Sequence, residues 1–372
     1  MPSLVGSEMC IRDRLKTICI VLGILILALL AYIVYLYASY YRIEDNQELV
    51  VEAPVDDTTT GAAAVLATDT EYSAVTYNIG FGAYLPDYSF FMDGGTSSWA
   101  ESPETVQYAI NGAGELVKSL DPDFTLIQEI DLDATRSYHT DEYEMLRNIL
   151  PEYTTVFAQN YDSAFLFYPF TQPHGSSRAG LGLFSKYPVS SALRRSFPIS
   201  TSFSKFFDLD RCYSVSRIPV DNGKELVIFN LHMSAYGNSD EIRKGQIEML
   251  CNDMAKEYEA GNYVLCGGDF NHDLKASEEN AESCESWAFP FPRSELPEHF
   301  TFCLDLLTEE EQAALWNSAR NADMEYVPGV TYTVTLDGFI ISDNIECLSY
   351  ENVNTGYSYS DHDPVKVEFM LK

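Results

Sequence analysis

Basic residues are scarce in this sequence. Its 372 residues include 23 Lys and Arg against 56 Asp and Glu, which gives a formal net charge of −33. Residues 44–372 hold 19 basic and 54 acidic residues, a formal charge of −35. Non-specific binding of nucleic acid depends on Lys and Arg that neutralise phosphates, and an acidic surface repels polyanions. The charge therefore disfavours nucleic acid as a partner without excluding it, while it allows metal ions to bind.

The sequence also lacks the cysteine patterns of a zinc site. Six cysteines follow residue 43, and they form neither a CxxC pair nor a zinc-like spacing. Cys266 lies within an apolar run and is expected to be a small core residue. Cys284 and Cys303 flank a proline-rich segment, so they are candidates for a disulfide if this part of the chain lies in an oxidising compartment.

One long run without charge lies near the N-terminus. Residues 17–41 are TICIVLGILILALLAYIVYLYASYY. About 20 apolar residues cross the core of a bilayer as a helix, so this run can span it with some tilt. Its tyrosines gather at the C-terminal end, where an interfacial aromatic belt would lie. A cleaved signal peptide is the alternative, but ASYY is a weak cleavage site, so we predict an uncleaved anchor over residues 15–43.

The charges that flank this run predict its orientation. Lys16 and the arginines before it lie on one side, and acidic residues follow Arg42 on the other. The positive-inside rule then predicts a single-pass protein of the cell membrane, with a cytoplasmic N-terminus and an extracytoplasmic domain. Residues 1–14 are doubtful, because PSLVGSEMCIRDR resembles translated sequencing-adapter read-through. Without them, the orientation depends on Lys16 and the acidic outer flank.

Composition divides the rest of the chain into two parts. Residues 44–70 are acidic, rich in Thr and Ala and without periodicity, which predicts a flexible acidic linker. Residues 71–372 have a globular composition with no internal repeat and no second linker. We therefore expect one domain over residues 71–372, and a monomer.

Strand-like and helical patterns interleave in this domain. Residues 103–120 and 239–259 have helical spacing and helix boundaries. Short turns such as VDNGKE join some strands as hairpins. The mixture predicts an α/β fold in which mixed sheets pack together with helices outside. The strand-like runs are YSAVTYNI, DFTLIQEI, GLGLFSKY, VSRIPV, ELVIFNLHM, NYVLCGG, DGFIIS and VKVEFMLK.

Polar residues recur where these strands end or begin. A single strand-terminal Asp, Asn or Glu usually contacts solvent, and a single His is usually structural. Strand ends along one edge of packed sheets lie close together, however, so the set predicts a site of hard oxygen ligands and two histidines. Such a site suits Mg²⁺, with Mn²⁺ or Ca²⁺ as alternatives, better than zinc or copper. The residues are Asn78, Glu129, His232, Asp269, Asn271, Asp337, Asp361 and His362.

Six segments resemble, in order and spacing, the motifs of the endonuclease/exonuclease/phosphatase superfamily, which has the deoxyribonuclease-I-like fold. They are VTYNIG, TLIQEID, IFNLHMSA, CGGDFNHD, TLDGFIISD and YSDHDPVKVEF, and the resemblance covers roughly residues 72–372. The resemblance implies a four-layered α/β sandwich of two mixed β-sheets flanked by helices, preceded here by the N-terminal helix. It also implies a metal-dependent phosphoric-ester hydrolase in which the glycines of GGDFN let the chain turn beneath a phosphate.

The resemblance assigns metal binding and phosphate contact to particular residues. Glu129 matches the principal metal ligand. Asn78 stands beside it to hold the metal or a phosphate oxygen, and Asp361 completes the acidic metal region. His232 occupies a position where family members contact phosphate. Arg178, in HGSSRAG, is a further candidate for binding a phosphate, although an exposed flexible loop is the alternative there.

Four other residues receive catalytic roles from the same resemblance. Asp269 would orient or deprotonate the attacking water, and Asn271 would stabilise the phosphorane-like transition state. His362 would act on the phosphate or the water. Asp337 would orient the imidazole and favour its protonated form.

The sequence leaves the substrate open. A PAWCDR-type run of the inositol-polyphosphate phosphatases is absent, and Gly338 stands where many nucleases have an aromatic residue. Residues 80–102 are long for a connection and predict a loop over the site. The substrate is a phosphate ester: nucleic acid, a sphingomyelin or phospholipid headgroup as in phospholipase-C-like enzymes, or a small ester. A catalytically inactive binding module on the same fold is the rival hypothesis, although no motif residue is missing.

Overall fold

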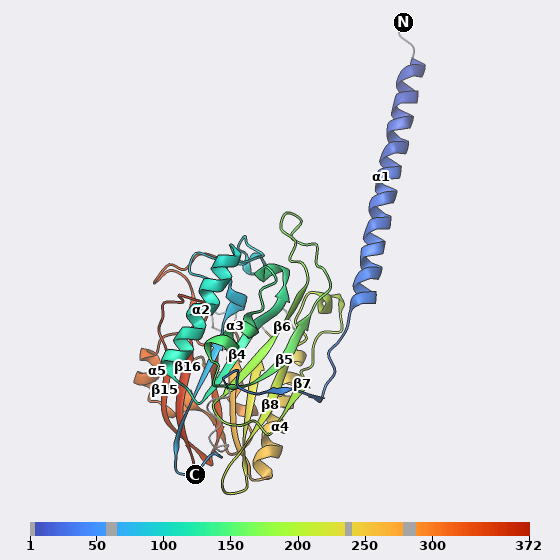
Figure 1. Ribbon diagram of the computed structural model, residues 1–372. Helices are drawn as coiled ribbons and strands as arrows, with labels where there is room; N and C mark the ends of the chain where they lie inside the picture. The colour runs from blue at the N-terminus through green and yellow to red at the C-terminus, as the bar shows by residue number, and fades with distance from the viewer. Residues whose placement is uncertain (1–3, 57–64, 235–239, 278–287) are drawn as a thin grey trace. The chain divides into compact units, whose positions relative to one another are not determined.

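A computed structural model describes residues 4–56, 65–234, 240–277 and 288–372 (Figure 1). The chain divides into two units, Met1–Arg42 and Ile43–Lys372. The first unit contains α1, Leu4–Ser39. Residues Ile11–Ser39 of this helix are long and apolar enough to cross a membrane. The predicted apolar run is therefore helical, whereas its orientation stays a prediction.

Two large mixed sheets form the second unit. In the described part of the chain, sheet A has the strand order β1-β7-β8-β9-β10-β14-β11, and sheet B has the order β15-β16-β3-β4-β6-β5-β2. Neighbouring strands are antiparallel except for β9 with β10 and β3 with β4. Sheet A consists of β1 (Gln47–Glu48), β7 (Ser191–Ser196), β8 (Cys212–Pro219), β9 (Glu225–His232), β10 (Tyr263–Asp269), β14 (Asp337–Ser342) and β11 (Phe300–Phe302). Sheet B consists of β15 (Ile345–Asn352), β16 (Val365–Leu371), β3 (Glu71–Asn78), β4 (Phe124–Ala134), β6 (Ser177–Ser185), β5 (Thr154–Asp162) and β2 (Val51–Glu52).

Helices cover the outer faces of the two sheets, which completes the four layers that the sequence predicts. On sheet B, α2 (Pro103–Leu120) and α3 (Glu142–Ile149) bury Ile110 and Leu146 against β3, β4 and β6. On sheet A, α4 (Asp240–Glu259) buries Leu250 in the main apolar core. That core also holds the apolar side chains that face each other between the sheets. The short helix α5 (Glu309–Ala314) begins with a Thr308 capping box, and β12 (Ala319–Arg320) pairs with β13 (Thr333–Val334).

The prediction of a flexible linker over residues 44–70 is wrong for its described parts. Strand β1 pairs with β7, and β2 pairs with β5. The backbone N–H of Ile43 donates to Asp210 Oδ2 at 2.6 Å, and Leu66 is buried. The edge strands β5 and β7 offer unpaired backbone groups that a passing segment can bind. Composition cannot reveal this pairing, because the partners lie more than a hundred residues away.

Two further predictions fall partly on residues that the structure does not describe. The predicted helix over residues 239–259 is α4 from Asp240 onward, and Ser239 lies outside the described residues. Cys284 also lies outside them, so the pairing of Cys284 with Cys303 stays a prediction. Cys266 is fully buried in β10, as predicted for a core residue.

Candidate active site

Sheet A aligns three polar residues in one row. The register of β9, β10 and β14 places Asp269 beside His232 on one side and Asp337 on the other. Each of these residues ends or begins its strand, and each is nearly or fully buried. Because backbone pairing sets this register, the three side chains lie at one edge of the sheet without help from loops.

Sheet B brings the second half of the site. Asn78 ends β3 opposite Gln128 of β4. At the next residue, Glu129, the pairing of β4 with β6 is irregular and φ is 57°. A bulge of this kind redirects a side chain, and a positive φ is uncommon for a residue with a Cβ. The irregularity therefore turns Glu129 toward Asn78, whose Nδ2 donates to Glu129 Oε1 at 3.3 Å and to Asp269 Oδ2 at 3.1 Å.

The two glycines of GGDFN lie within β10 and not in the turn that follows it. A Cβ on Gly268, whose φ is 146°, would lie 2.1 Å from the carbonyl oxygen of Leu231 in β9. A Cβ on Gly267 would lie 2.5 Å from the ring of Phe339. Close strand packing therefore requires both glycines. The chain turns instead at Asn271, whose φ is 51° and whose N–H donates to Asp269 Oδ1 at 2.8 Å.

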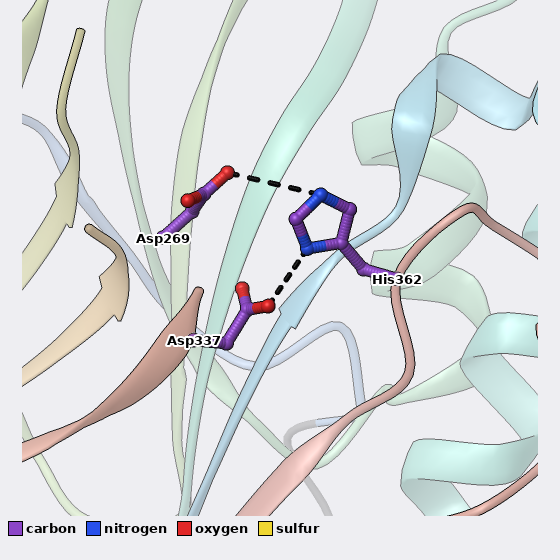
Figure 2. A group of neighbouring side chains, drawn as sticks. All are labelled: Asp269, Asp337 and His362. Atoms are coloured by element: carbon purple, nitrogen blue, oxygen red, sulfur yellow. Dashed lines mark hydrogen bonds and ion pairs between the residues drawn. The ribbon is translucent and has the colours of Figure 1, made fainter. Parts of the chain in front are cut away.

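His362 and Asp337 form the predicted pair (Figure 2). His362 Nδ1 lies 2.7 Å from Asp337 Oδ2, and His362 Nε2 lies 3.9 Å from Asp269 Oδ2. Burial disfavours the charged imidazolium, but Asp337, by charge and hydrogen bond, and the charges of Asp269 and Asp361 outweigh it and raise the pKa of His362 well above its ordinary value. Ser318 Oγ donates to Asp337 Oδ2 at 2.7 Å, which fixes the carboxylate.

Asp269 and His232 lie at the centre of the site, and their surroundings favour the neutral form of both side chains: the pKa of Asp269 is raised and that of His232 is lowered. Burial raises the pKa of Asp269 to about 7, against the opposing effects of His362 and of its hydrogen bonds. Burial and the positive charges of Arg211, His362 and Arg136 lower the pKa of His232 well below its ordinary value. His232 is therefore neutral, with Nε2 at 3.5 Å from Asp269 Oδ2. Asp269 can exchange a proton near neutral pH, which suits a general base.

Glu129 and Asp361 are the carboxylates best suited to hold a metal ion. Burial and the charge of Asp361 raise the pKa of Glu129, and burial raises the pKa of Asp361. No Lys or Arg of the described residues lies within ion-pair distance of either carboxylate. Two neighbouring, partly buried acids without such a cation fit a divalent ion with oxygen ligands. Asn78 turns its nitrogen toward the acids, while its Oδ1 accepts from the N–H of Gly80 at 3.0 Å, so its role as a ligand stays a prediction.

Asp269, Asp337 and His362 also lie close enough to one another to hold an ion. The expectation that Glu129 and Asp361 hold the metal instead stays a prediction, and physical grounds favour it. The short contact between Asp337 and His362 occupies Nδ1, and a protonated imidazole repels a cation. The three residues in Figure 2 are therefore better explained as acid–base groups.

The site forms the floor of a cavity of about 610 Å³. We define the floor as Asn78, Glu129, His232, Asp269, Asn271, Asp337, Asp361 and His362, of which all but Asn78 and Asp337 line the cavity. Most of the wall above it comes from four connections that we call the rim loops: residues 79–102, 163–176, 197–211 and 321–332. Each loop contributes lining side chains, among them Asp93, His174, Phe207 and Asp323. The expected loop over the site, residues 80–102, is therefore one of four.

Arg178, a predicted phosphate ligand, does not line this cavity. Its side chain is 53% exposed, and Nη2 donates to Asp133 Oδ2 at 3.0 Å. Residues 177–185 form β6, and their pairing with β4 directs this side chain to Asp133 at the surface. The structure therefore does not bring Arg178 to the cavity with the other predicted residues.

Three other arginines line the cavity and were not predicted. Arg136 is bound by Asp131 through two hydrogen bonds. Arg320 donates to the backbone carbonyls of Tyr84 and Leu85. Arg211 is 7% exposed, and its Nε and Nη1 have no hydrogen-bond partner among the described residues. Only the position of Arg211 one residue before a strand could have drawn attention to it.

Comparisons with known proteins agree with this geometry. The profile of the Endonuclease/Exonuclease/phosphatase family matches residues 75–304. No curated protein matches the sequence.

Solved structures share the fold at low sequence identity. An endonuclease/exonuclease/phosphatase from Beutenbergia cavernae is 14% identical with a TM-score of 0.54, over 81% of this chain and 72% of that one. TDP2 from D. rerio, complexed with a single-strand DNA product, is 14% identical with a TM-score of 0.53, over 81% and 99%. ANGEL2, a 2′,3′-cyclic phosphatase in complex with adenosine-2′,3′-vanadate, is 13% identical with a TM-score of 0.55, over 81% and 96%. At these identities the likeness shows the fold alone.

Proposed function

The chain belongs to the endonuclease/exonuclease/phosphatase family, and from this premise we propose that it is a divalent-metal-dependent phosphodiester hydrolase. One observation carries the proposal. His362, held by Asp337, lines a single cavity together with the centrally placed Asp269 and the acids Glu129 and Asp361. The whole catalytic set that the motifs predict is present, which argues against an inactive binding module.

Each floor residue has a different role in hydrolysis. Asp269, with a pKa of about 7, accepts a proton from the attacking water. The imidazolium of His362, held by Asp337, places a positive charge and a proton donor beside the phosphate. Asn271 lines the cavity; one of its amide N–H bonds is used on the carbonyl of Met233, which leaves the other for a phosphate oxygen. Water adds its oxygen to phosphorus and one proton goes to the departing alkoxide, so an alcohol and a phosphate monoester are released.

Glu129 and Asp361 would hold the metal ion, for which Mg²⁺ is our choice and Mn²⁺ or Ca²⁺ the alternatives. A bound divalent ion neutralises charge on a phosphate oxygen and lowers the pKa of water. Arg211 adds a second positive group, because its buried side chain lines the cavity and its Nε and Nη1 have no hydrogen-bond partner among the described residues, although Nε lies 3.9 Å from Asp208 Oδ1. Together these charges offset the acidity of the domain where the substrate binds.

We further propose that α1 anchors the enzyme in the cell membrane with the catalytic unit outside the cytoplasm. The length and apolar character of residues Ile11–Ser39 support a span, and Lys16 with the acidic outer flank supports the orientation. Protease added to intact cells should degrade the catalytic unit. Protection in intact cells together with degradation after lysis would contradict the orientation.

An activity screen tests the enzymatic proposal. The full chain, purified in detergent, is assayed on bis-p-nitrophenyl phosphate, plasmid DNA, phosphatidylinositol and sphingomyelin with Mg²⁺, Mn²⁺, Ca²⁺ or EDTA. We expect hydrolysis that requires a divalent ion. Full activity in EDTA would contradict metal dependence, and no hydrolysis of any substrate would contradict the proposed reaction.

A further inference from the structure

Two cysteines of the described chain lie next to each other at one edge of the catalytic unit. Cys303 begins the short 3-10 helix η8 (Cys303–Leu306), directly after β11, and Cys347 lies in β15. Cys303 is a fully buried member of the main apolar core, and Cys347 is half-buried and packs against that core. The two side chains also form a hydrogen bond with each other. Their sulfur atoms therefore lie within reach of a covalent bond after a small rotation of the side chains.

The two cysteines lie on different sheets. In the described part of the chain, β11 is the last strand at one end of sheet A, and β15 is the last strand at one end of sheet B. Helix η8 contacts β15, and β14 also contacts β15. A bond between Cys303 and Cys347 would therefore connect the two sheets at an edge where their described strands share no backbone pairing.

The two thiols differ in reactivity. The hydrogen bond from Cys303 lowers the pKa of Cys347 against the effect of burial. Burial and the neighbouring Cys347 raise the pKa of Cys303 well above its ordinary value. The chain neighbours Glu346 and Leu348 are exposed, so a reagent can approach Cys347. Because the thiolate is the nucleophile in thiol–disulfide exchange, Cys347 is suited to attack a reagent and Cys303 to complete the reaction.

The other described cysteines of the catalytic unit lack this combination of access and pKa. Burial raises the pKa of Cys212 to about 11 and that of Cys251 to about 12. It also raises the pKa of Cys266 well above its ordinary value. All three side chains are buried, and buried thiols with a raised pKa are inert. Oxidation should therefore begin at Cys347.

From this geometry we propose that Cys303 and Cys347 are a redox-active pair, which a disulfide of low molecular weight, R–S–S–R, converts into a disulfide that links the two sheets. The Cys347 thiolate attacks one sulfur of R–S–S–R, forms a mixed disulfide and releases R–S⁻. Cys303 then loses its proton, attacks the Cys347 sulfur and releases the second R–S⁻. Two protein thiols and one R–S–S–R become one protein disulfide and two R–SH, so the protein is oxidised and the reagent is reduced.

The cross-link would lie close to the strand that carries Asp337. Tyr350 is buried in the same core as the two cysteines, and its hydroxyl donates to the backbone carbonyl of Asp337 at 3.4 Å. Strand β11, which ends just before Cys303, pairs with β14, which begins at Asp337. Neither cysteine lines the cavity. The disulfide should therefore stabilise the support of the Asp337–His362 pair without adding a group to the cavity.

Peptide mapping identifies the bond. The full chain is purified with dithiothreitol, which is then removed, and is treated with 2-hydroxyethyl disulfide, an uncharged reagent that the acidic unit does not repel. The remaining thiols are alkylated before digestion. We expect a cross-linked peptide pair that contains Cys303 and Cys347 and that dithiothreitol separates. A bond between Cys303 and Cys284, the pairing suggested by the sequence, would overturn the proposal. Reagent that stays on Cys347 as a mixed disulfide, or full alkylation of both thiols, would also overturn it.

Thermal melts measure what the bond does. Oxidised wild type should have a Tm about 5 °C above that of reduced wild type, because the bond closes the loop of residues 303–347 and restricts the unfolded chain. Cys347→Ser should have the same Tm under both conditions. Cys347→Ala, which adds no polar group beside the core, is a second variant with the same expectation. Cys284→Ser is the matched control that removes the rival partner, and it should keep the shift.

Two results of the melts would contradict the proposal. A shift that persists in Cys347→Ser and Cys347→Ala would assign the oxidation to other thiols and overturn the pair. An unchanged Tm in wild type that carries the mapped bond would show that the bond does not hold the sheets together.

Discussion

The floor and the rim of the cavity are built by different means. Floor residues stand at strand ends, where backbone pairing sets their positions: Asp269 lies beside His232 and Asp337 because β9, β10 and β14 pair in that register. Rim residues stand on connections whose positions depend on side-chain contacts and on other loops. The difference suggests a division of labour in which the rigid floor performs the chemistry and the rim selects what reaches it.

Polar contacts between the sheets reinforce the floor. Gln128, next to Glu129 on sheet B, donates to Asn230 Oδ1 on sheet A at 2.8 Å. Asn230 Nδ2 in turn donates to the carbonyl of Gly182 at 3.0 Å. These buried amides satisfy one another and fix the spacing of the two sheets directly below the site. In the rim, Arg320 plays the corresponding part, because it donates hydrogen bonds to backbone carbonyls of the first rim loop.

The largest effect is expected for the acid that holds the metal. Glu129→Ala should lower kcat by about a thousand-fold, since a metal supplies several kcal/mol of transition-state stabilisation. Tm should not fall, because Glu129 is a partly buried acid with a raised pKa and no Lys or Arg partner among the described residues. Activity at saturating Mg²⁺ and a thermal melt measure both. If the variant retained more than a tenth of the wild-type rate, Glu129 would not be the main ligand.

The Asp337–His362 pair should follow with about a hundred-fold loss. Asp337→Asn keeps the shape of the side chain but removes the charge that raises the pKa of His362. The activity step assigned to the histidine should then move to lower pH. Adding His362→Ala to Asp337→Asn should cost little more than His362→Ala alone, because groups that act as a unit are not additive. Full additivity in this double-mutant cycle on kcat would show that the two residues act independently.

The sequence predicted the floor because its signals are local. An apolar run followed by Asn, Glu, His or Asp recurs along the chain, and the ends of packed strands converge. The cavity lining confirms this for Glu129, Asp269 and His362. The sequence could not show how each side chain is oriented. Two examples are the bulge that turns Glu129 and the orientation of the Asn78 amide.

The rim was predicted poorly, for a physical reason. Arg178 was chosen from a glycine-rich segment that proved to be the start of β6. Arg320 reaches the cavity because its neighbour Ala319 bridges to His362, a contact between residues more than forty positions apart. The pairing of β1 and β2 with the sheets is equally distant. Such distant contacts leave no pattern in the local sequence, whereas a strand end is marked by an apolar run followed by a polar residue.

Replacing Arg211 and Arg178 separately compares the arginine found in the cavity with the one predicted from the sequence. Arg211→Gln should raise KM for a phosphodiester about ten-fold, because a buried donor that faces the substrate is lost. Arg178→Gln is the matched control and should change neither kcat nor KM, since Arg178 contacts Asp133 outside the cavity. Steady-state kinetics on bis-p-nitrophenyl phosphate decide between them. The reverse result would restore the sequence-based choice.

The last effect is on stability and concerns the response of the rim to acid. His174 lies in the second rim loop, buried between its neighbours, with ring contacts to Phe90 and Phe91. Burial and the charge of Arg136 lower the pKa of His174 to about 3. Its pKa in the folded chain is thus below the unfolded value of about 6.5, so the unfolded chain binds a proton first as the pH falls. The stabilisation by neutral His174 is complete above about pH 6.5 and is lost progressively between that pH and 3.

This linkage has a measurable size. Between pH 8 and pH 5, His174 should cost the wild-type protein about 2 kcal/mol of unfolding free energy, since each pH unit below 6.5 removes about 1.4 kcal/mol. Urea unfolding of wild type and of His174→Gln at both pH values isolates this contribution, because the many carboxylates titrate alike in the two proteins. His174→Gln should therefore lose less stability on acidification. An equal loss of stability in both proteins would contradict this prediction. It would mean that the second rim loop opens and hydrates His174 before the domain unfolds, so that the rim is looser than the floor.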